Sequence, residues 1–288
     1  MPNKDKLEKQ IKALAEEPDK QFVARLGVKL VKQANQMEAK SRVLRYFSVA
    51  AGIIACLLLI VTLKLNAESE APAAVREANS PSVLIYHTHS QESFVSETKT
   101  STEIHSVNDP QHNISRVGKR LADALQTNKI SAIQSPIDFA SEAKNQQKDF
   151  SELYLMSREN VKEMLAIHKD IQMVLDVHRD SRQRNMTTLK INNNEVAKIR
   201  LVINNSHPNW ERNLGFAQMI SKKAQKMYPE FPIEVIEQKG MSPVYWNQDL
   251  HPRAVLVEIG GMENTLEEEY ASADILAKIL AEVLRKAD

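Results

Sequence analysis

Short apolar runs alternate with longer amphipathic stretches over the second, larger part of the chain. Runs rich in Val, Ile and Leu and bounded by polar residues are typical of strands in a buried sheet. They predict strands at Val83–Tyr86, Met173–Val177, Ala197–Ile203, Ile233–Ile236 and Ala254–Ile259.

Helical periodicity appears between these runs. Apolar residues that recur every three or four positions predict helices at Ile114–Gln126, Ser157–Ile167, Asn209–Met227 and Thr265–Lys286. Asn113 is a suitable N-cap for the first helix. Because strands and helices alternate, we expect an α/β fold, with a twisted, mostly parallel sheet flanked by helices.

A different pattern precedes this region. Phe47–Leu63 is a predominantly apolar stretch that carries no charge. At about 1.5 Å per residue such a helix spans roughly 26 Å, close to the hydrocarbon thickness of a bilayer. A buried core helix is the alternative. However, Lys40, Arg42 and Arg45 crowd the amino side of the run, and this asymmetry places the N-terminus in the cytoplasm.

These patterns divide the chain into four parts. The stretch after the apolar run is small, polar and acidic, which is typical of a linker. We expect a single-pass protein of the cytoplasmic membrane, made of a cytoplasmic segment (1–46), a transmembrane helix (47–64), a linker (65–80) and an extracytoplasmic domain (81–288).

Composition narrows the range of functions. The chain has 38 Lys and Arg against 37 Asp and Glu, a formal net charge of +1, so no bulk field draws it to nucleic acid. Cys56 is the single cysteine and lies inside the apolar run. This excludes a disulfide within the chain and a cysteine-based zinc site, so the exterior domain must be stabilised by its core.

Three of the predicted strands lead into histidine or glutamate. The first strand runs into His87 and His89, with Glu92 close behind, the second runs into His178, and the last contains Glu258. In open α/β sheets the functional crevice lies outside the carboxyl ends of the strands. We therefore expect these side chains to converge.

Their chemistry suits a hydrolytic zinc ion. Such an ion takes three protein ligands from His, Asp and Glu and leaves a fourth position for water. His89 and Glu92 are three positions apart just past a strand end, where a turn can direct both at one ion, and His178 is the candidate third ligand. Glu258 is the candidate general base that accepts the proton of the water.

Each part of this pattern has a plainer alternative. The His89–Glu92 segment alone also fits a surface loop, and Glu258 alone also fits a buried acid paired with Arg179. Side chains alternate along an extended segment, so we expect His87 to share a face with His89 and to orient the ion or touch substrate. Arg179 and His87 are the candidates to assist the oxyanion.

Four motifs together resemble a known family. They are Tyr-His-Thr-His-Ser-Gln-Glu-Ser-Phe at 86–94, Asp-Val-His-Arg-Asp at 176–180, Tyr-Trp-Asn-Gln-Asp-Leu at 245–250 and Leu-Val-Glu-Ile-Gly-Gly-Met-Glu-Asn-Thr-Leu-Glu-Glu at 256–268. In order and spacing they resemble the stage II sporulation protein P family, whose fold is similar to that of the zinc-dependent N-acetylmuramoyl-L-alanine amidases. The resemblance covers about residues 82–285.

The resemblance implies a membrane-anchored peptidoglycan hydrolase. Members of the family cleave the N-acetylmuramoyl-L-alanine amide bond, are credited with endopeptidase cleavage of cross-bridges, and act with a glycan-cleaving partner during engulfment of the forespore. His89, Glu92 and His178 match the metal ligands of the family, and Glu258 matches its catalytic acid/base. Other membrane proteins are expected as partners.

The chain also departs from the family pattern. Its linker is short and its cytoplasmic segment is unusual, so general wall remodelling is the alternative to engulfment. Asn247 and Asp249 match a motif to which the resemblance assigns no role. A non-catalytic peptidoglycan-binding module and a protein-directed metallopeptidase are the alternative functions.

Overall fold

The computed structural model describes residues 29, 80–98, 107–240, 242 and 244–285. The chain divides into two units, Met1–Pro72 and Ala73–Asp288, and all the elements named below belong to the second. The expected cytoplasmic segment, transmembrane helix and linker lie outside the described residues, apart from Lys29 and Ser80. Within the described residues, no helix has the length and apolar character that a membrane span needs.

A six-stranded sheet forms the centre of the second unit, in the order β2-β1-β3-β8-β6-β7. The strands β2, β1, β3 and β8 run parallel to one another. β6 is antiparallel to β8, and β7 is parallel to β6. The predicted mostly parallel sheet is therefore confirmed. The strands are β1 (Val83–Tyr86), β2 (Ala132–Gln134), β3 (Met173–Asp180), β6 (Ile199–Asn204), β7 (Ile233–Gln238) and β8 (Ala254–Gly261).

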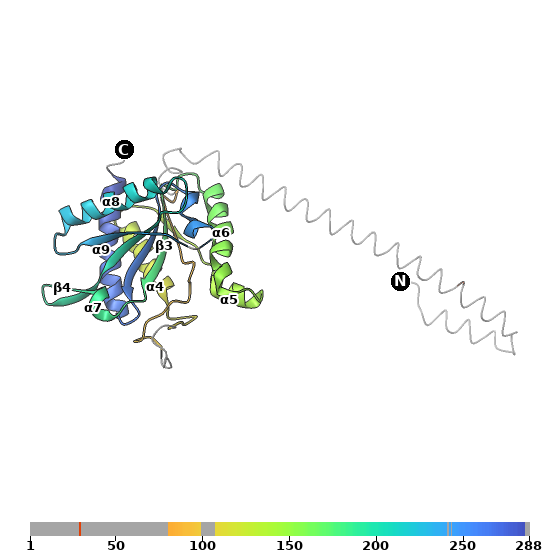
Figure 1. The fold of residues 1–288 in the computed structure, drawn as a ribbon, viewed down its shortest axis with the longest axis horizontal. Coiled ribbons are helices and arrows are strands. Elements are labelled where there is room, and N and C mark those ends of the chain that lie inside the picture. Colours follow the sequence, from red (N-terminus) through yellow and green to blue (C-terminus); the bar gives the residue numbers. More distant parts are fainter. Residues whose placement is uncertain (1–28, 30–79, 99–106, 241, 243, 286–288) are drawn as a thin grey trace, which may run out of the picture. The chain divides into compact units, whose positions relative to one another are not determined.

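Helices cover both faces of this sheet, with α5 and α6 on one side and α8 and α9 on the other (Figure 1). The helix α4 packs against α9 and shares its face. The helices are α4 (Ile114–Thr127), α5 (Phe139–Asn145), α6 (Leu153–Ile167), α7 (Arg184–Thr187), α8 (Trp210–Met227) and α9 (Leu266–Leu284), with two 3-10 turns, η1 (Phe150–Glu152) and η2 (Tyr245–Leu250).

The strand order reverses at β1, which lies between β2 and β3. From β1 the chain passes through α4 to β2 on one side, and then through α5 and α6 to β3 on the other side of β1. The two crossovers run on opposite faces of the sheet, so the chain leaves β1 and β2 in different directions. Such a reversal of strand order is where ligands bind in open α/β sheets.

Alternation along the strands assigns side chains to the two faces. Ile85 joins the large core cluster with α4, α8 and α9, whereas Tyr86 joins the smaller cluster with α5 and α6. In β3, Val174 belongs to the smaller cluster, and Asp176 and His178 follow it at the period of two. The polar end of β3 therefore lies on the α6 face.

The predicted strands and helices are present, with some changed boundaries. Asn113 caps α4 as expected, since its side chain accepts a hydrogen bond from the Ser115 N–H. The helix α6 begins at Leu153 rather than Ser157, because the turn η1, closed by a capping box between Asp149 and Glu152, leads directly into it. The short elements β2, α5, α7, η1 and η2 were not predicted.

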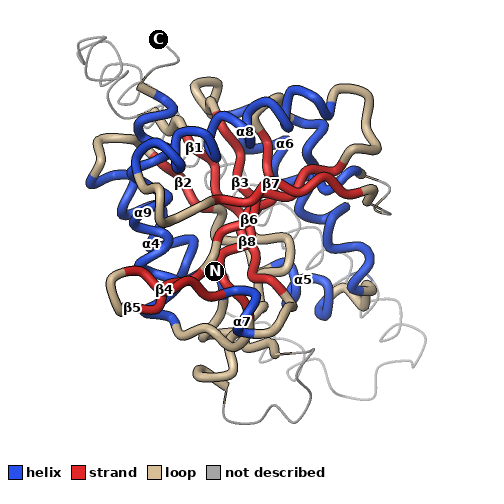
Figure 2. The backbone as a smooth tube through the Cα atoms, turned by 60° about the vertical axis from the view of Figure 1, so that its left-hand side comes forward, coloured by secondary structure: helices blue, strands red, loops and turns tan. Residues whose placement is uncertain are grey.

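The strand predicted at Ala197–Ile203 is present as β6 but starts two residues later, because Ala197 belongs to another strand. β5 (Asn194–Ala197) ends at Ala197 in a hairpin with β4 (Thr188–Ile191), beside α7 (Figure 2), and β6 begins at Ile199. Lys198 separates them. Its N–H donates to the Thr187 carbonyl and its carbonyl accepts from the Gly260 N–H, so the chain changes partners at this residue.

Two helical glycines make the packing of α4 testable. A Cβ on Gly118 would lie 2.2 Å from Nε2 of buried His87, whereas a Cβ on exposed Gly215 of α8 would meet nothing within 4 Å. We expect Gly118→Ala to lower the free energy of unfolding by roughly 1–2 kcal/mol, since overpacking outweighs the gain in helix propensity. Gly215→Ala, the matched control, should raise it by up to about 1 kcal/mol. Urea unfolding measures both, and equal stabilities would contradict the packing of His87 on α4.

Candidate metal centre

Three of the predicted side chains converge near the carboxyl ends of β1 and β3. Ligand atoms of His89, Glu92 and His178 all lie within 4.8 Å of one another. His89 Nδ1 is 3.5 Å from Glu92 Oε1, and His178 Nδ1 is 3.4 Å from Glu92 Oε2. The turn after β1 brings the first two together, because the Glu92 N–H donates to the His89 carbonyl. The group can hold a metal ion.

A second set of contacts fixes this turn against α5. Asp138 is the N-cap of α5, and its carboxylate also accepts hydrogen bonds from Ser90 Oγ at 2.6 Å and Gln91 Nε2 at 2.8 Å. Ser90 and Gln91 lie between the two ligand candidates of the turn. The turn is therefore held by side chains on both sides and does not depend on strand pairing alone.

The charges around the group favour a cation. Burial raises the pKa of Glu92, but His178 and His89 overcome this effect and hold it below its ordinary range. Burial lowers the pKa of His178, but Asp176 and Glu92 raise it well above the ordinary value. The carboxylates of Asp176 and Glu92 thus stabilise positive charge at the imidazole of His178, and their negative charge also favours a bound cation.

Asp176 lies directly behind His178. Its Oδ1 is 2.9 Å from His178 Nε2, a short ion-pair contact that is off the line of an ideal hydrogen bond. Its carboxylate also accepts hydrogen bonds from the Thr88 N–H at 2.9 Å and the Thr88 hydroxyl at 2.8 Å. A carboxylate in this position fixes the ring orientation of a metal-binding histidine.

Glu258 lies on the strand next to His178, in register with it. Burial raises the pKa of Glu258 to about 7, and the charge of Asp180 acts in the same direction, whereas Arg200 and His178 lower it. Arg200 Nη1 is 3.0 Å from Glu258 Oε2 and 2.8 Å from Asp180 Oδ2. A carboxyl with this pKa exchanges protons near neutral pH.

Aromatic side chains border the group on the α6 side. The ring centroid of Phe150 lies 4.5 Å from that of His89, and the ring of Tyr154 meets His89 edge-on at 5.4 Å. Phe150 is 66% exposed, which is unusual for a large apolar side chain. An exposed aromatic beside a polar site is typical of a surface that contacts a ligand.

The expectation that His87 shares a face with His89 is wrong. His87 packs against Gly118 of α4, whereas His89 lies against Phe150 and Tyr154 on the opposite face. The alternation stops because β1 ends at Tyr86 and a turn follows. Burial lowers the pKa of His87 to about 4, so its ring is neutral.

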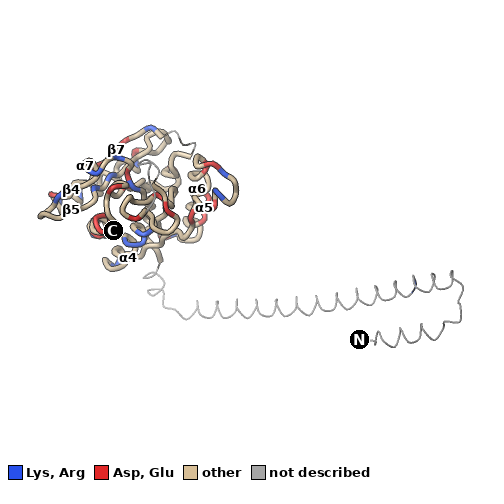
Figure 3. The backbone as a smooth tube through the Cα atoms, turned by 90° about the horizontal axis from the view of Figure 1, so that it is seen from below, with Lys and Arg blue, Asp and Glu red and all other residues tan. Residues whose placement is uncertain are grey.

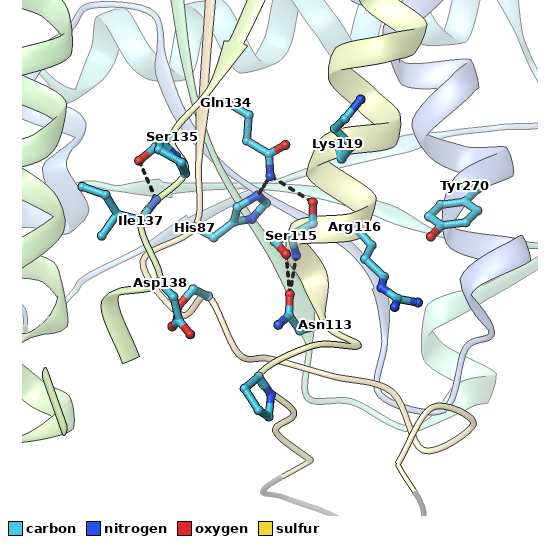
Figure 4. Close-up of a pocket in the computed structure, with 13 residues that line it drawn as sticks. His87, Asn113, Ser115, Arg116, Lys119, Gln134, Ser135, Ile137, Asp138 and Tyr270 are labelled. Atoms are coloured by element: carbon cyan, nitrogen blue, oxygen red, sulfur yellow. Dashed lines mark hydrogen bonds between the residues drawn. The ribbon is translucent and has the colours of Figure 1, made fainter. Parts of the chain in front are cut away.

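Both ring nitrogens of His87 already have partners. Nδ1 lies 2.8 Å from the Val177 carbonyl oxygen and therefore donates to it, and Nε2 accepts from the Gln134 amide at 3.0 Å. His87 forms part of a separate cleft of about 770 Å³ between α4 and the segment after β2 (Figure 4). His89, Glu92 and His178 do not line this cleft.

The contacts of Arg179 also differ from its expected role beside the oxyanion. Its guanidinium donates to the backbone carbonyls of Ser93, Val107 and Asp180, and its backbone N–H donates to Glu92 Oε2 at 3.1 Å. Glu258 pairs with Arg200 and not with Arg179. Arg179 thus holds the loop that carries Glu92, and its charge is directed at backbone oxygens.

The sequence argument missed Asp176, Thr88, Arg200 and Tyr154. Asp176 precedes His178 by two residues on a strand, so the shared face was a usable signal. Arg200 had no such signal, because its pairing with Glu258 depends on β6 running antiparallel to β8. Tyr154 lies in a helix that begins earlier than its periodicity indicated.

Comparison with known proteins places this site in context. Among solved structures, the CwlD amidase of Clostridioides difficile, determined in complex with the GerS lipoprotein, matches with a TM-score of 0.44 and 12% identity. The match covers 71% of this chain and 97% of that one.

Sequence relatives are closer. Stage II sporulation protein P of Bacillus subtilis (strain 168) is 33% identical over 208 residues, which make up 72% of this chain and 52% of the relative. The chain thus spans about half the length of the curated relative that it matches. A family model for stage II sporulation protein P matches residues 1–281, which include all four motifs and the convergent side chains. The chain therefore belongs to the stage II sporulation protein P family.

Proposed function

We propose that this protein is a metal-dependent peptidoglycan hydrolase that cleaves the amide bond between N-acetylmuramic acid and L-alanine. The observation that carries the proposal is a three-residue ligand group next to Glu258, a carboxyl whose pKa is raised to about 7. The sporulation family to which the chain belongs supports peptidoglycan as the substrate.

We propose Zn²⁺ as the ion, held by His89, Glu92 and His178. Two imidazoles and one carboxylate are a donor set that suits zinc. With ligands about 2.1 Å from a tetrahedral ion, neighbouring ligand atoms are about 3.4 Å apart. His89 Nδ1 is 3.5 Å from Glu92 Oε1 and His178 Nδ1 is 3.4 Å from Glu92 Oε2, so each imidazole lies at about this spacing from one oxygen of the carboxylate. When bound, zinc lowers the pKa of a water molecule and polarises the substrate carbonyl.

The residues around the ion then have separate tasks. Glu258 accepts the proton of the attacking water and then donates it to the departing L-alanine nitrogen. A pKa of about 7 allows the carboxyl both to take up and to release a proton near neutral pH. Arg200 holds Glu258 in place and shares its charge with Asp180. Phe150 and Tyr154 offer an aromatic surface beside His89 on which a sugar or methyl group of the substrate can pack.

The location of the enzyme is part of the proposal. We place residues 47–64 in the cytoplasmic membrane, residues 1–46 in the cytoplasm and residues 81–288 outside, where the cell wall is the abundant amide substrate. A glycan-cleaving enzyme is the proposed partner, in engulfment or in general wall remodelling. Acidic and basic residues are interspersed along the described part of this domain (Figure 3).

Loss of any one ligand should remove the ion. We expect His89→Ala, Glu92→Ala and His178→Ala each to abolish stoichiometric zinc binding and hydrolysis of purified sacculi, because three ligands are the usual minimum for a catalytic site. Elemental analysis and dye release measure the two effects. His168→Gln, at the distant end of α6, is the control that should retain both. A ligand variant that keeps its zinc would refute the assignment.

Glu258→Gln separates catalysis from metal binding. We expect normal zinc content and a loss of turnover of about 10²–10⁴-fold, since an amide cannot accept the proton of the water. Glu234→Gln, which also removes a carboxylate near Arg200, should stay active. Mass spectrometry of the products identifies the bond, because amide cleavage exposes the amino group of L-alanine. Zinc without product release would favour a wall-binding module, and activity on denatured protein would favour a metallopeptidase.

The pH dependence tests the electrostatics of Glu258. A general base works only when ionised, so kcat/KM should fall as the pH drops through the pKa of Glu258. Because Arg200 lowers this pKa, Arg200→Met should move the acidic limb to higher pH. A bound cation lowers the pKa of Glu258 in the wild type and in Arg200→Met alike, so the pKa of Glu258 stays higher in the variant. Arg182→Met is the control, since Arg182 pairs with Asp180. If the acidic limb of kcat/KM in Arg200→Met lies at the same pH as in the wild type or at a lower pH, the role of Arg200 is contradicted.

A further inference from the structure

The motif at 245–250 has no role in the chemistry described above, yet its backbone is unusual. Tyr245, Trp246 and Asn247 have φ values of 52°, 53° and 61°, the left-handed region that residues other than glycine rarely adopt. A conformation of this kind is maintained only when surrounding contacts enforce it, and it tends to occur at functional sites. Asn247 is 1% exposed, so its side chain is directed into the protein.

A continuous series of hydrogen bonds leads from Asn247 to Asp176. Asn247 Nδ2 is 2.9 Å from Ser157 Oγ, and Ser157 Oγ is 2.9 Å from Thr88 Oγ1. Thr88 Oγ1 is 2.8 Å from Asp176 Oδ2, and the other carboxylate oxygen lies 2.9 Å from His178 Nε2. The side chains come from η2, α6, the turn after β1, and β3, and the four are buried.

The chemistry of the two ends fixes the direction of every bond. The amide nitrogen of Asn247 only donates, and the ionised carboxylate of Asp176 only accepts. The Thr88 hydroxyl must therefore donate to Asp176, so its oxygen accepts from the Ser157 hydroxyl, whose oxygen accepts from Asn247. Each hydroxyl donates once and accepts once along the same line, an arrangement in which hydrogen bonds strengthen one another.

We propose that Asn247 is a positioning residue for His178 and acts through Ser157, Thr88 and Asp176. The donors directed at Asp176 hold its carboxylate in place, 2.9 Å from Nε2 of His178, where its negative charge favours a proton on that nitrogen. This fixes the tautomer in which His178 Nδ1 carries the lone pair that faces Glu92 and the ion. The inference rests on the proposed metal site.

A neighbouring contact of the same motif provides a matched control. Asp249 forms two hydrogen bonds with Arg158 of α6, at 2.7 Å and 2.6 Å. This pair also attaches the motif to α6, but its groups are not members of the series that ends at Asp176. Asp249→Asn therefore reports the effect of loosening the motif without changing the donors behind His178.

The test compares zinc affinity in the full-length protein by competition with a chelator. Asn247→Asp is isosteric, tolerates the left-handed backbone, and replaces the donor to Ser157 with an acceptor. Thr88→Val removes the hydroxyl and keeps the shape of the side chain. We expect each to weaken zinc binding by about 10-fold, and Thr88→Ser and Asp249→Asn to remain within about twofold of the wild type. Wild-type affinity in folded Asn247→Asp and Thr88→Val would overturn the proposal, as would a loss in Asp249→Asn equal to theirs.

The double variant distinguishes a series from two independent contacts. Once Thr88→Val has interrupted the series, Asn247→Asp should cost little more, so the effects on zinc affinity should not add. Additive losses would overturn the proposal. If Asn247→Asp does not fold, Ser157→Ala takes its place in the cycle.

Nitrogen NMR of the zinc-loaded protein gives a readout independent of turnover. His178 should show a metal-bound Nδ1 and a protonated Nε2, and the Nε2 proton should exchange faster with water in Thr88→Val. A metal-bound Nε2 would overturn the proposal. If the ring behaves as expected but sacculi are not cleaved, the proposed reaction fails while the positioning role stands.

Discussion

Thr88 binds the carboxylate of Asp176 twice, through its backbone N–H and through its hydroxyl. The pairing of β1 with β3 ends at Tyr86 and Asp176, so these bonds continue the connection after the ladder stops. The next residue along the chain is His89. The position of one ligand candidate therefore depends on the same carboxylate that orients the other, His178. Thr88 thus joins the segments of the two histidines, alongside the hydrogen bonds from Arg179 to Glu92 and Ser93.

The site also depends on different pKa values for carboxyl groups that lie close together. Asp176 is buried and Glu92 is partly buried, but His178 lies between them and lowers the pKa of both. Glu258 is partly buried near Asp180, and the guanidinium of Arg200 pairs with both of these acids. The first pair therefore stays ionised and attracts a cation, whereas Glu258 can take up and release a proton. Environments that separate pKa values in this way assign the roles of acid and base.

The sequence predicted the parts of this site that follow from local rules. The strand ends that carry His178 and Glu258 were predictable from short apolar runs, and the His89–Glu92 turn from its spacing. The prediction for His87 failed where the strand ended, because alternation holds only while the backbone is extended. Arg200 was not predictable, since the direction of β6 is decided by packing in the folded sheet. The left-handed turn at Tyr245–Asn247 likewise has no glycine to signal it.

The helix α6 joins the two sides of the proposed mechanism. Ser157 faces Thr88 and Asn247, while Tyr154, one turn earlier, lies against His89 on the substrate side. The two positions share a helix face, because residues three apart are neighbours on a helix. The contacts that fix the orientation of His178 therefore also fix Tyr154 beside His89. This coupling explains why the motif at 245–250, far from the ligands in sequence, is attached to α6 by both Asn247 and Asp249.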